Sequence, residues 1–219
     1  MYNKKLNRTN VKKEIGWVYD DLKWLTGKEL KSANNERDAL LKSLSKEASF
    51  SFMQSKIHIG ELSPGCLMCA TGHWSCLYIN GLCTANCFYC RQDRKIREER
   101  LPKEEIYFDN PEYYIAYAEK LNFKGIGFSG GETLLVFDKL LRYIEKIRER
   151  FGKSMYLWIY TNGNLATKDK LKRLKKSGLD EIRFNISAND YDLRPAELAV
   201  GIMNTVTVEI PSIPEDYEI

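Results

Sequence analysis

Residues 75 to 90 read SCLYINGLCTANCFYC, a short apolar stretch that runs directly into three closely spaced cysteines. Residues 75–80 have the length and the apolar and aromatic content of a buried strand. Cys83, Cys87 and Cys90 follow in a C-x3-C-x2-C pattern. A structural metal site usually takes four protein ligands, whereas three leave one coordination position open. The stretch therefore predicts a strand that ends in a metal-binding loop with an open position.

Expected strands alternate with expected helices after the cysteines. Besides 75–80, the sequence predicts strands at 124–129, 156–161, 181–187 and 205–211, and helices from Asn110-Pro111, over 133–151, from Thr167 to Gly178 and around 194–203. This alternation predicts a parallel α/β sheet, either doubly wound or closed into a barrel. Because a complete eight-stranded barrel takes ~250 residues, five strands fit a partial barrel better.

The first part of the chain predicts a separate helical extension. Apolar residues recur at helical spacing after a Thr9 or Asn10 cap, at Val11, Ile15, Val18, Leu22 and Leu25. A second helix is expected from about 35 to 46. We therefore expect a helical extension over 1–56 and a main domain over 57–219, with no sixth strand in the tail SIPEDYEI.

Composition and charge narrow the class of protein. The 219 residues are 43% hydrophobic and 29% charged, as in globular proteins, with no apolar run near the ~18 residues of a membrane span. The polar N-terminus shows no secretory signal, so a cytoplasmic protein without a membrane partner is expected. Because the cytoplasm keeps thiols reduced, the six cysteines are expected to bind metal rather than to form disulfides. The net charge of +4 is spread among acids and bases, so no nucleic-acid partner is expected.

A zinc ribbon is an alternative reading of the same cysteines. C-x2-C pairs at 66–69 and 87–90 are separated by 17 residues, within the spacing of a four-cysteine zinc site. That reading leaves Cys76 and Cys83 unused and closes the pairs over the expected strand. It would make the chain a zinc-stabilised α/β binding module without catalysis.

A G-x-G-x-x-G pattern at Gly125, Gly127 and Gly130 resembles the dinucleotide fingerprint. That fingerprint belongs in the turn after a strand, whereas two of these glycines fall inside the expected strand 124–129. We therefore interpret them as allowing tight packing around a cofactor.

The C-x3-C-x2-C spacing, with Tyr89 directly before the last cysteine, closely resembles the signature of the radical S-adenosylmethionine (radical SAM) superfamily. In that superfamily the cysteine loop follows the first strand of a partial (β/α)6 TIM-type barrel. The resemblance implies this α/β fold, here truncated after the fifth strand and preceded by a helical extension. It also implies that Cys83, Cys87 and Cys90 hold a [4Fe-4S] cluster with one iron open to S-adenosylmethionine.

A Gly-Gly-Glu stretch ends the second strand in the superfamily, and Gly130, Gly131 and Glu132 match it here. The resemblance implies that this turn binds the amino group of the methionine moiety, because glycine permits close backbone approach. Barrels place their active sites at the carboxyl ends of the strands. By this position, the further candidates for cofactor binding are Thr161, Asn162, Asn185, Ser187 and residues 209–211. Tyr89 is a candidate because it belongs to the cysteine motif.

The activity implied by the resemblance is reductive cleavage of S-adenosylmethionine. One electron from a flavodoxin- or ferredoxin-type donor would give methionine and a 5′-deoxyadenosyl radical, which abstracts hydrogen from a peptide, protein or small-molecule substrate. A further reading is that the chain is the radical-generating part of a larger enzyme.

A second group of cysteines precedes the first. Cys66, Cys69 and Cys76 with His73 form C-x2-C-x3-H-x2-C, which predicts a mononuclear structural zinc or iron site. Two alternatives to this site are an auxiliary iron–sulfur cluster and a mononuclear site in which His58 replaces His73 as the fourth ligand. Residues 58 to about 90 most resemble the methanogenesis marker protein ten group, cobalamin-dependent radical SAM methyltransferases. This implies peptide or protein methylation, but we expect no counterpart of their C-terminal cobalamin-binding part, so cobalamin dependence stays open.

Overall fold

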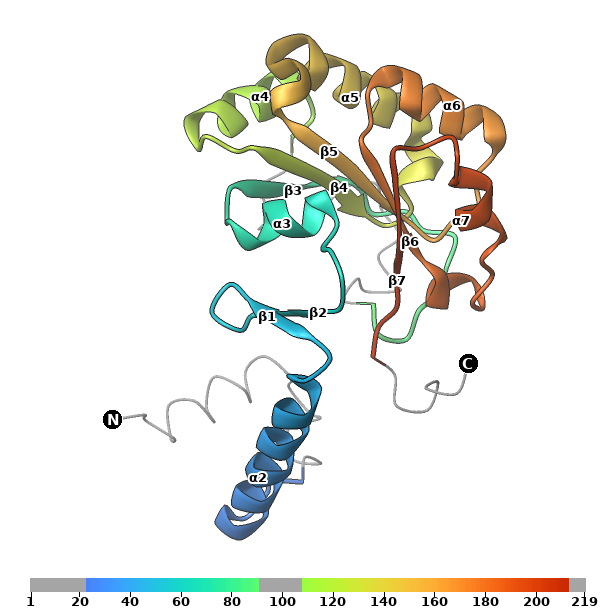
Figure 1. Cartoon of the computed structure of the whole chain (residues 1–219). Helices are drawn as coiled ribbons and strands as arrows, with labels where there is room; N and C mark the ends of the chain where they lie inside the picture. The colour runs from blue at the N-terminus through green and yellow to red at the C-terminus, as the bar shows by residue number, and fades with distance from the viewer. Residues whose placement is uncertain (1–22, 91–107, 213–219) are drawn as a thin grey trace. The chain divides into compact units, whose positions relative to one another are not determined.

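The computed structural model describes residues 23–90 and 108–212 of the chain (Figure 1). The chain divides into two compact units, Met1–Gly60 and Glu61–Ile219, four residues after the predicted domain boundary. Most of the first predicted helix, and all but the first residue of the tail, lie outside the described residues.

The first unit contains helix α2 (Gly27–Leu44) and a hairpin of β1 (Ser49–Ser51) and β2 (Lys56–His58). α2 begins earlier than predicted because Thr26 and Glu29 form a capping box, in which each side chain receives the other residue's backbone N–H. The hairpin was not predicted, since its strands are only three residues long.

The second unit is built on a parallel sheet of five strands: β3 (Trp74–Asn80), β4 (Gly125–Gly130), β5 (Tyr156–Thr161), β6 (Glu181–Asn185) and β7 (Thr205–Glu209). Their order in space is their order in the chain. A doubly wound sheet would reverse direction at a switch point, so the sequential order fits the predicted partial barrel instead. The α/β fold class is confirmed.

Helices follow the strands and cover one face of the sheet (Figure 1): α4 (Pro111–Lys120), α5 (Phe137–Phe151) after the 3-10 turn η2 (Thr133–Val136), α6 (Lys168–Ser177) and α7 (Arg194–Ala199). Register partners Leu77, Phe128, Ile159, Ile182 and Val206 form one row of the sheet, and the first four are fully buried in the core with the apolar sides of α4 and α5. The predicted apolar side of the long helix, from Leu134 to Ile147, is buried as expected.

The opposite face of the sheet receives a helix that was not predicted, α3 (Pro64–Ala70). Ser63 caps it and Pro64 occupies its first turn, so the helix-start signal was present in the sequence. The seven-residue helix packs against β4 and β5 (Figure 1). It therefore covers the sheet face near the amino ends of these strands.

A buried carboxylate fixes α3 to the sheet. Glu181 is fully buried and accepts hydrogen bonds from Ser63 Oγ (3.1 Å), Gly65 N (3.0 Å), Tyr156 OH (3.0 Å), Arg183 Nε (2.7 Å) and Thr207 Oγ1 (2.9 Å). The Arg183 guanidinium is itself only 5% exposed and also bonds Glu209. A buried ion pair is tolerated when its remaining polar groups are satisfied, as they are here.

Two glycines of β4 make room on this inner face. A Cβ on Gly125 would lie 2.5 Å from Met68 Cγ of α3, and a Cβ on Gly127 would lie 2.6 Å from Trp158 Nε1. The expected packing around a cofactor is therefore wrong for these two positions: they accommodate side chains of the protein itself.

Gly127→Ala should destabilise the second unit by about 1–3 kcal/mol, because Trp158 is fully buried and cannot move away from the added methyl group. Urea unfolding followed by tryptophan fluorescence measures this. Gly27→Ala is the control, since nothing lies within 4 Å of its added Cβ. Equal unfolding midpoints for Gly127→Ala and the parent would contradict the account.

Candidate functional site

The loop after β3 carries the three thiols of the C-x3-C-x2-C motif. Cys83 and Cys87 are half-buried and Cys90 is exposed. Burial raises the pKa of Cys83, the Ala85 N–H at 3.4 Å lowers it, and nearby Glu132, Cys87 and Cys90 raise it further. Cys90 N donates to Cys87 O at 3.2 Å, which closes the end of the loop. The three predicted ligands therefore lie on one loop, and Cys87 and Cys90 contribute to the electrostatic surroundings of Cys83.

The Gly-Gly-Glu turn lies directly against the start of this loop. Gly131 N donates to Asn80 O at 2.8 Å, and Glu132 N donates to Leu82 O at 2.7 Å. A Cβ on Gly130 would lie 2.2 Å from Asn80 O, and one on Gly131 would lie 1.9 Å from Leu82 O. Gly130 also has a φ of +125°, which only glycine adopts readily. Both glycines are thus required by backbone contacts within the protein.

The Glu132 side chain is turned into the protein and is 1% exposed. Its carboxylate accepts hydrogen bonds from Leu134 N (2.9 Å), Thr161 Oγ1 (2.7 Å) and Asn162 N (2.8 Å). Burial raises the pKa of Glu132, and the Asn162, Leu134 and Thr161 hydrogen bonds oppose that rise. The carboxylate therefore joins the end of β4 to the end of β5.

Asn162 continues this connection to the cysteine loop. Its Nδ2 donates to Thr84 Oγ1 at 2.9 Å and lies 3.8 Å from Cys83 Sγ. An amide N–H directed at a sulfur stabilises negative charge on that sulfur, an effect that tunes metal–thiolate sites.

Tyr89 joins the other end of the loop to β6. Its hydroxyl lies 2.6 Å from Ser187 Oγ and donates to Asn185 Oδ1 at 3.3 Å, while Ser187 Oγ donates to Asn185 Oδ1 at 2.8 Å. Burial raises the pKa of Tyr89, so the phenol stays a hydrogen-bond donor.

The predicted cofactor-binding residues therefore lie at the carboxyl ends of β3 to β6. Asn80 was missed, although it is fully buried and its side chain bonds Glu132 O (3.1 Å) and Leu82 N (2.7 Å). Its position at the end of a predicted strand was the available signal. Glu209, a weaker candidate on β7, instead accepts a hydrogen bond from Arg183 Nη1 at 3.0 Å.

The second cysteine group is distributed over α3 and β3. Cys66 and Cys69 lie on α3, and Cys76 lies on β3 with its Sγ 2.8 Å from Ser129 Oγ. Burial raises the pKa of Cys76, and the nearby Cys69 thiol adds to that rise. The carbonyl of His73 accepts from Lys124 N at 2.7 Å. His58, in the first unit, contacts Ser51 Oγ at 3.0 Å.

The donor sets differ in how well they suit a metal. Among residues 23–90 and 108–212, no three His, Cys, Asp or Glu side chains lie close enough together to enclose a metal ion as they stand. Three thiols on one loop nevertheless match the donor chemistry of a cubane cluster with one open iron. Cys83, Cys87 and Cys90 therefore fit such a cluster in donor type and in their spacing along one loop.

Comparisons with known proteins decide the family. The sequence model described as the Radical SAM superfamily matches residues 77–200, more than half of the chain. The chain belongs to the radical SAM superfamily. Members of this superfamily use S-adenosylmethionine and a [4Fe-4S] cluster, and they need an electron donor and a substrate.

Two curated proteins are similar in sequence to part of this chain. A protein of Methanocaldococcus jannaschii named as a putative glycyl-radical enzyme activating enzyme is 30% identical over 169 residues, which are 70% of this chain and 44% of that protein. A probable GTP 3′,8-cyclase of Pyrococcus abyssi is 32% identical over 120 residues, which are 54% of this chain and 35% of that protein. The chain thus spans less than half the length of the relatives it matches. Neither name mentions methyl transfer or a methanogenesis marker.

Two solved structures are similar in part. BtrN in an open conformation has a TM-score of 0.43 at 20% identity, covering 64% of this chain and 57% of that one. Coproporphyrinogen III oxidase (HemN) from Escherichia coli, described as a radical SAM enzyme, has a TM-score of 0.42 at 12% identity, covering 68% and 40%. Over the described part of the chain, no helix combines the length and hydropathy of a membrane span.

Asn162→Ala should weaken retention of a reconstituted cluster by about tenfold, because loss of a hydrogen-bond donor beside a metal ligand typically has effects of this size. The side chain would no longer bond Thr84 or approach Cys83. The rate at which visible absorption decays with a chelator measures this. Asn164→Ala, an exposed position nearby, is the control and should match the parent. Equal decay rates in both variants would contradict the assignment.

Proposed function

We propose that this chain holds a [4Fe-4S] cluster through Cys83, Cys87 and Cys90 and initiates radical chemistry by cleaving S-adenosylmethionine. The observation that supports this best is the contact between the Gly-Gly-Glu turn and the start of the cysteine loop, where Glu132 N donates to Leu82 O at 2.7 Å. Because the chain spans less than half of its curated relatives, the activity of the whole protein is part of the proposal.

Different residues would bind the cluster, bind the methionine moiety and position the site. The three thiolates would bind three irons, and the turn at Gly130 and Gly131 would present backbone groups to the methionine moiety. When bound, the cluster supplies the one electron that breaks a carbon–sulfur bond of S-adenosylmethionine, giving methionine and a 5′-deoxyadenosyl radical. Glu132 is fully engaged by internal donors. Its role is therefore to position Thr161 and Asn162.

The substrate that we propose is a glycyl or other backbone position of a protein or peptide. This is supported by the relative named as a putative glycyl-radical enzyme activating enzyme. The radical would take one hydrogen atom from that position, forming 5′-deoxyadenosine and a carbon-centred substrate radical. Methylation, and with it cobalamin, stays a prediction of the sequence.

Anaerobic reconstitution tests the proposal. With iron, sulfide, S-adenosylmethionine and dithionite, the full chain should bind about four irons with inorganic sulfide and form 5′-deoxyadenosine. Cys87→Ala should lose the visible absorption and the product, whereas Asn86→Ala, an exposed neighbour in the same loop, should keep both. A colourless protein that binds zinc alone would instead support the non-catalytic binding module.

The second metal site can be tested separately. If Cys66, Cys69, His73 and Cys76 bind zinc or iron, Cys66→Ala should lower the metal content by one ion per chain and leave the cluster's iron and sulfide unchanged. Elemental analysis of parent and variant measures this. Identical metal content would remove the second site from the account.

A further inference from the structure

Helix α6 carries an unusual concentration of positive charge. Six of its ten residues are Lys or Arg and one is Asp. Lys168, Lys172 and Lys176 are exposed and lie four residues apart, so they share one side of the helix. We call these three residues the basic stripe.

The basic stripe is not explained by pairing within the protein. The described residues provide no hydrogen bond or ion pair to any of its three lysines. On the neighbouring α5, by contrast, Lys146 pairs with Glu149 at 2.6 Å, and Arg150 pairs with Glu119. Two basic residues of α5 are thus paired with carboxylates, whereas no carboxylate of the described residues pairs with the stripe.

This arrangement weakens the helix itself. Like charges four residues apart cost about 0.2–0.5 kcal/mol per pair. Lys168, in the first turn, also opposes the helix dipole, where a carboxylate would be favourable. The basic stripe therefore opposes the stability of α6, which favours a binding role over a solvated structural face.

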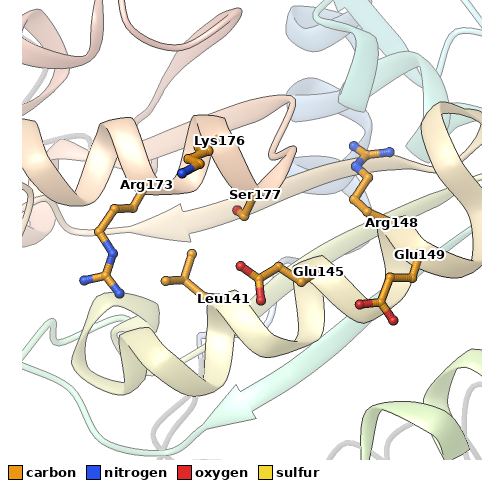
Figure 2. Close-up of a pocket in the computed structure, with 7 residues that line it drawn as sticks. All are labelled: Leu141, Glu145, Arg148, Glu149, Arg173, Lys176 and Ser177. Atoms are coloured by element: carbon orange, nitrogen blue, oxygen red, sulfur yellow. The ribbon is translucent and has the colours of Figure 1, made fainter.

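The groove between α5 and α6 is a poorer candidate for binding. Figure 2 shows Glu145 and Glu149 of α5 on one side and Arg173 and Lys176 of α6 on the other, so its charges nearly balance. Arg148 in this groove is committed to backbone carbonyls, including Gly178 O at 2.8 Å, and to Asp180. Lys176, the last residue of the basic stripe, also borders this groove, whereas Lys168 and Lys172 do not line it.

The first turn of α6 is connected to the cysteine loop through a series of hydrogen bonds. Lys170 Nζ donates to Leu134 O at 3.2 Å, and Leu134 N donates to the Glu132 carboxylate at 2.9 Å. Glu132 also holds Asn162, whose Nδ2 lies 3.8 Å from Cys83 Sγ. A protein bound at Lys168 and Lys172 would thus stand at the edge of the sheet that carries the three thiols.

We propose that the basic stripe docks an acidic one-electron carrier protein. This inference rests on the proposed function. The reduced carrier would lose one electron and the cluster would gain it, with no bond formed or broken in docking. Complementary charge of this kind raises association rates by about 10-fold to 1,000-fold and is weakened by salt. Nucleic acid, the other common partner of a basic surface, is an outcome of the test.

The double variant Lys168→Glu/Lys172→Glu tests the docking surface. With a reduced acidic flavodoxin as donor, the second-order rate constant for reduction of the cluster, measured by stopped-flow absorption, should fall about tenfold. With dithionite, a small donor that needs no docking surface, the rate should equal that of the parent. Binding of the oxidised flavodoxin, measured calorimetrically, should weaken in parallel and lose its salt dependence.

Lys120→Glu/Lys153→Glu is the matched control. It makes the same change in net charge at exposed positions that precede β4 and β5, at the opposite edge of the sheet. Its flavodoxin-dependent rate should equal the parent's. An equal loss in the control, an equal loss with dithionite, or no loss in the stripe variant would each overturn the docking proposal. So would a stripe variant that loses duplex DNA binding but keeps flavodoxin binding.

The two proposals can fail independently. If the parent forms 5′-deoxyadenosine with dithionite and the stripe variant is reduced by flavodoxin as fast as the parent, only the docking surface is wrong. If the reconstituted parent forms no product with either donor, the proposed function is wrong, and the docking proposal is rejected with it.

Discussion

The carbonyl oxygen of Leu82 lies 1.9 Å from the point where a Cβ on Gly131 would stand. This approach brings the turn after β4 onto the first residues of the cysteine loop, and two backbone hydrogen bonds to Asn80 and Leu82 hold it there. Any other residue at Gly131 would separate the two segments. The remaining parts of the candidate site depend on this contact, because Glu132 follows it directly and organises the end of β5.

Buried carboxylates hold the sheet at both of its ends. Glu132 accepts three hydrogen bonds at the carboxyl ends of the strands, and Glu181 accepts five at the amino ends. Burying a carboxylate costs free energy unless its oxygens accept hydrogen bonds. Each of these carboxylates therefore requires hydrogen-bond donors at defined positions around it. One carboxylate supports the cysteine loop after β3, and the other fixes α3, which carries Cys66 and Cys69. The two cysteine groups are thus positioned by separate networks.

The strands and the cysteine loop could be predicted because their signals are local. Apolar stretches bounded by glycine and proline gave all five strands of the sheet, and residues 156–161 match β5 at both ends. α3 was missed because it is short and is stabilised by Glu181, which lies 116 residues beyond Gly65. The role of Gly127 was misjudged for the same reason, since only the folded chain shows Trp158 beside it. Contacts between distant residues leave no periodic pattern in a sequence.

The open coordination position is the central claim, and electron paramagnetic resonance tests it most directly. The reconstituted chain, reduced by dithionite, should give the signal of a [4Fe-4S]⁺ cluster, and adding S-adenosylmethionine should shift its g-values because the cofactor binds the iron without a cysteine ligand. A Cys87→Ala variant, which lacks one of the three proposed ligands, should give neither the signal nor the shift. A spectrum of the parent chain that S-adenosylmethionine leaves unchanged would contradict the account.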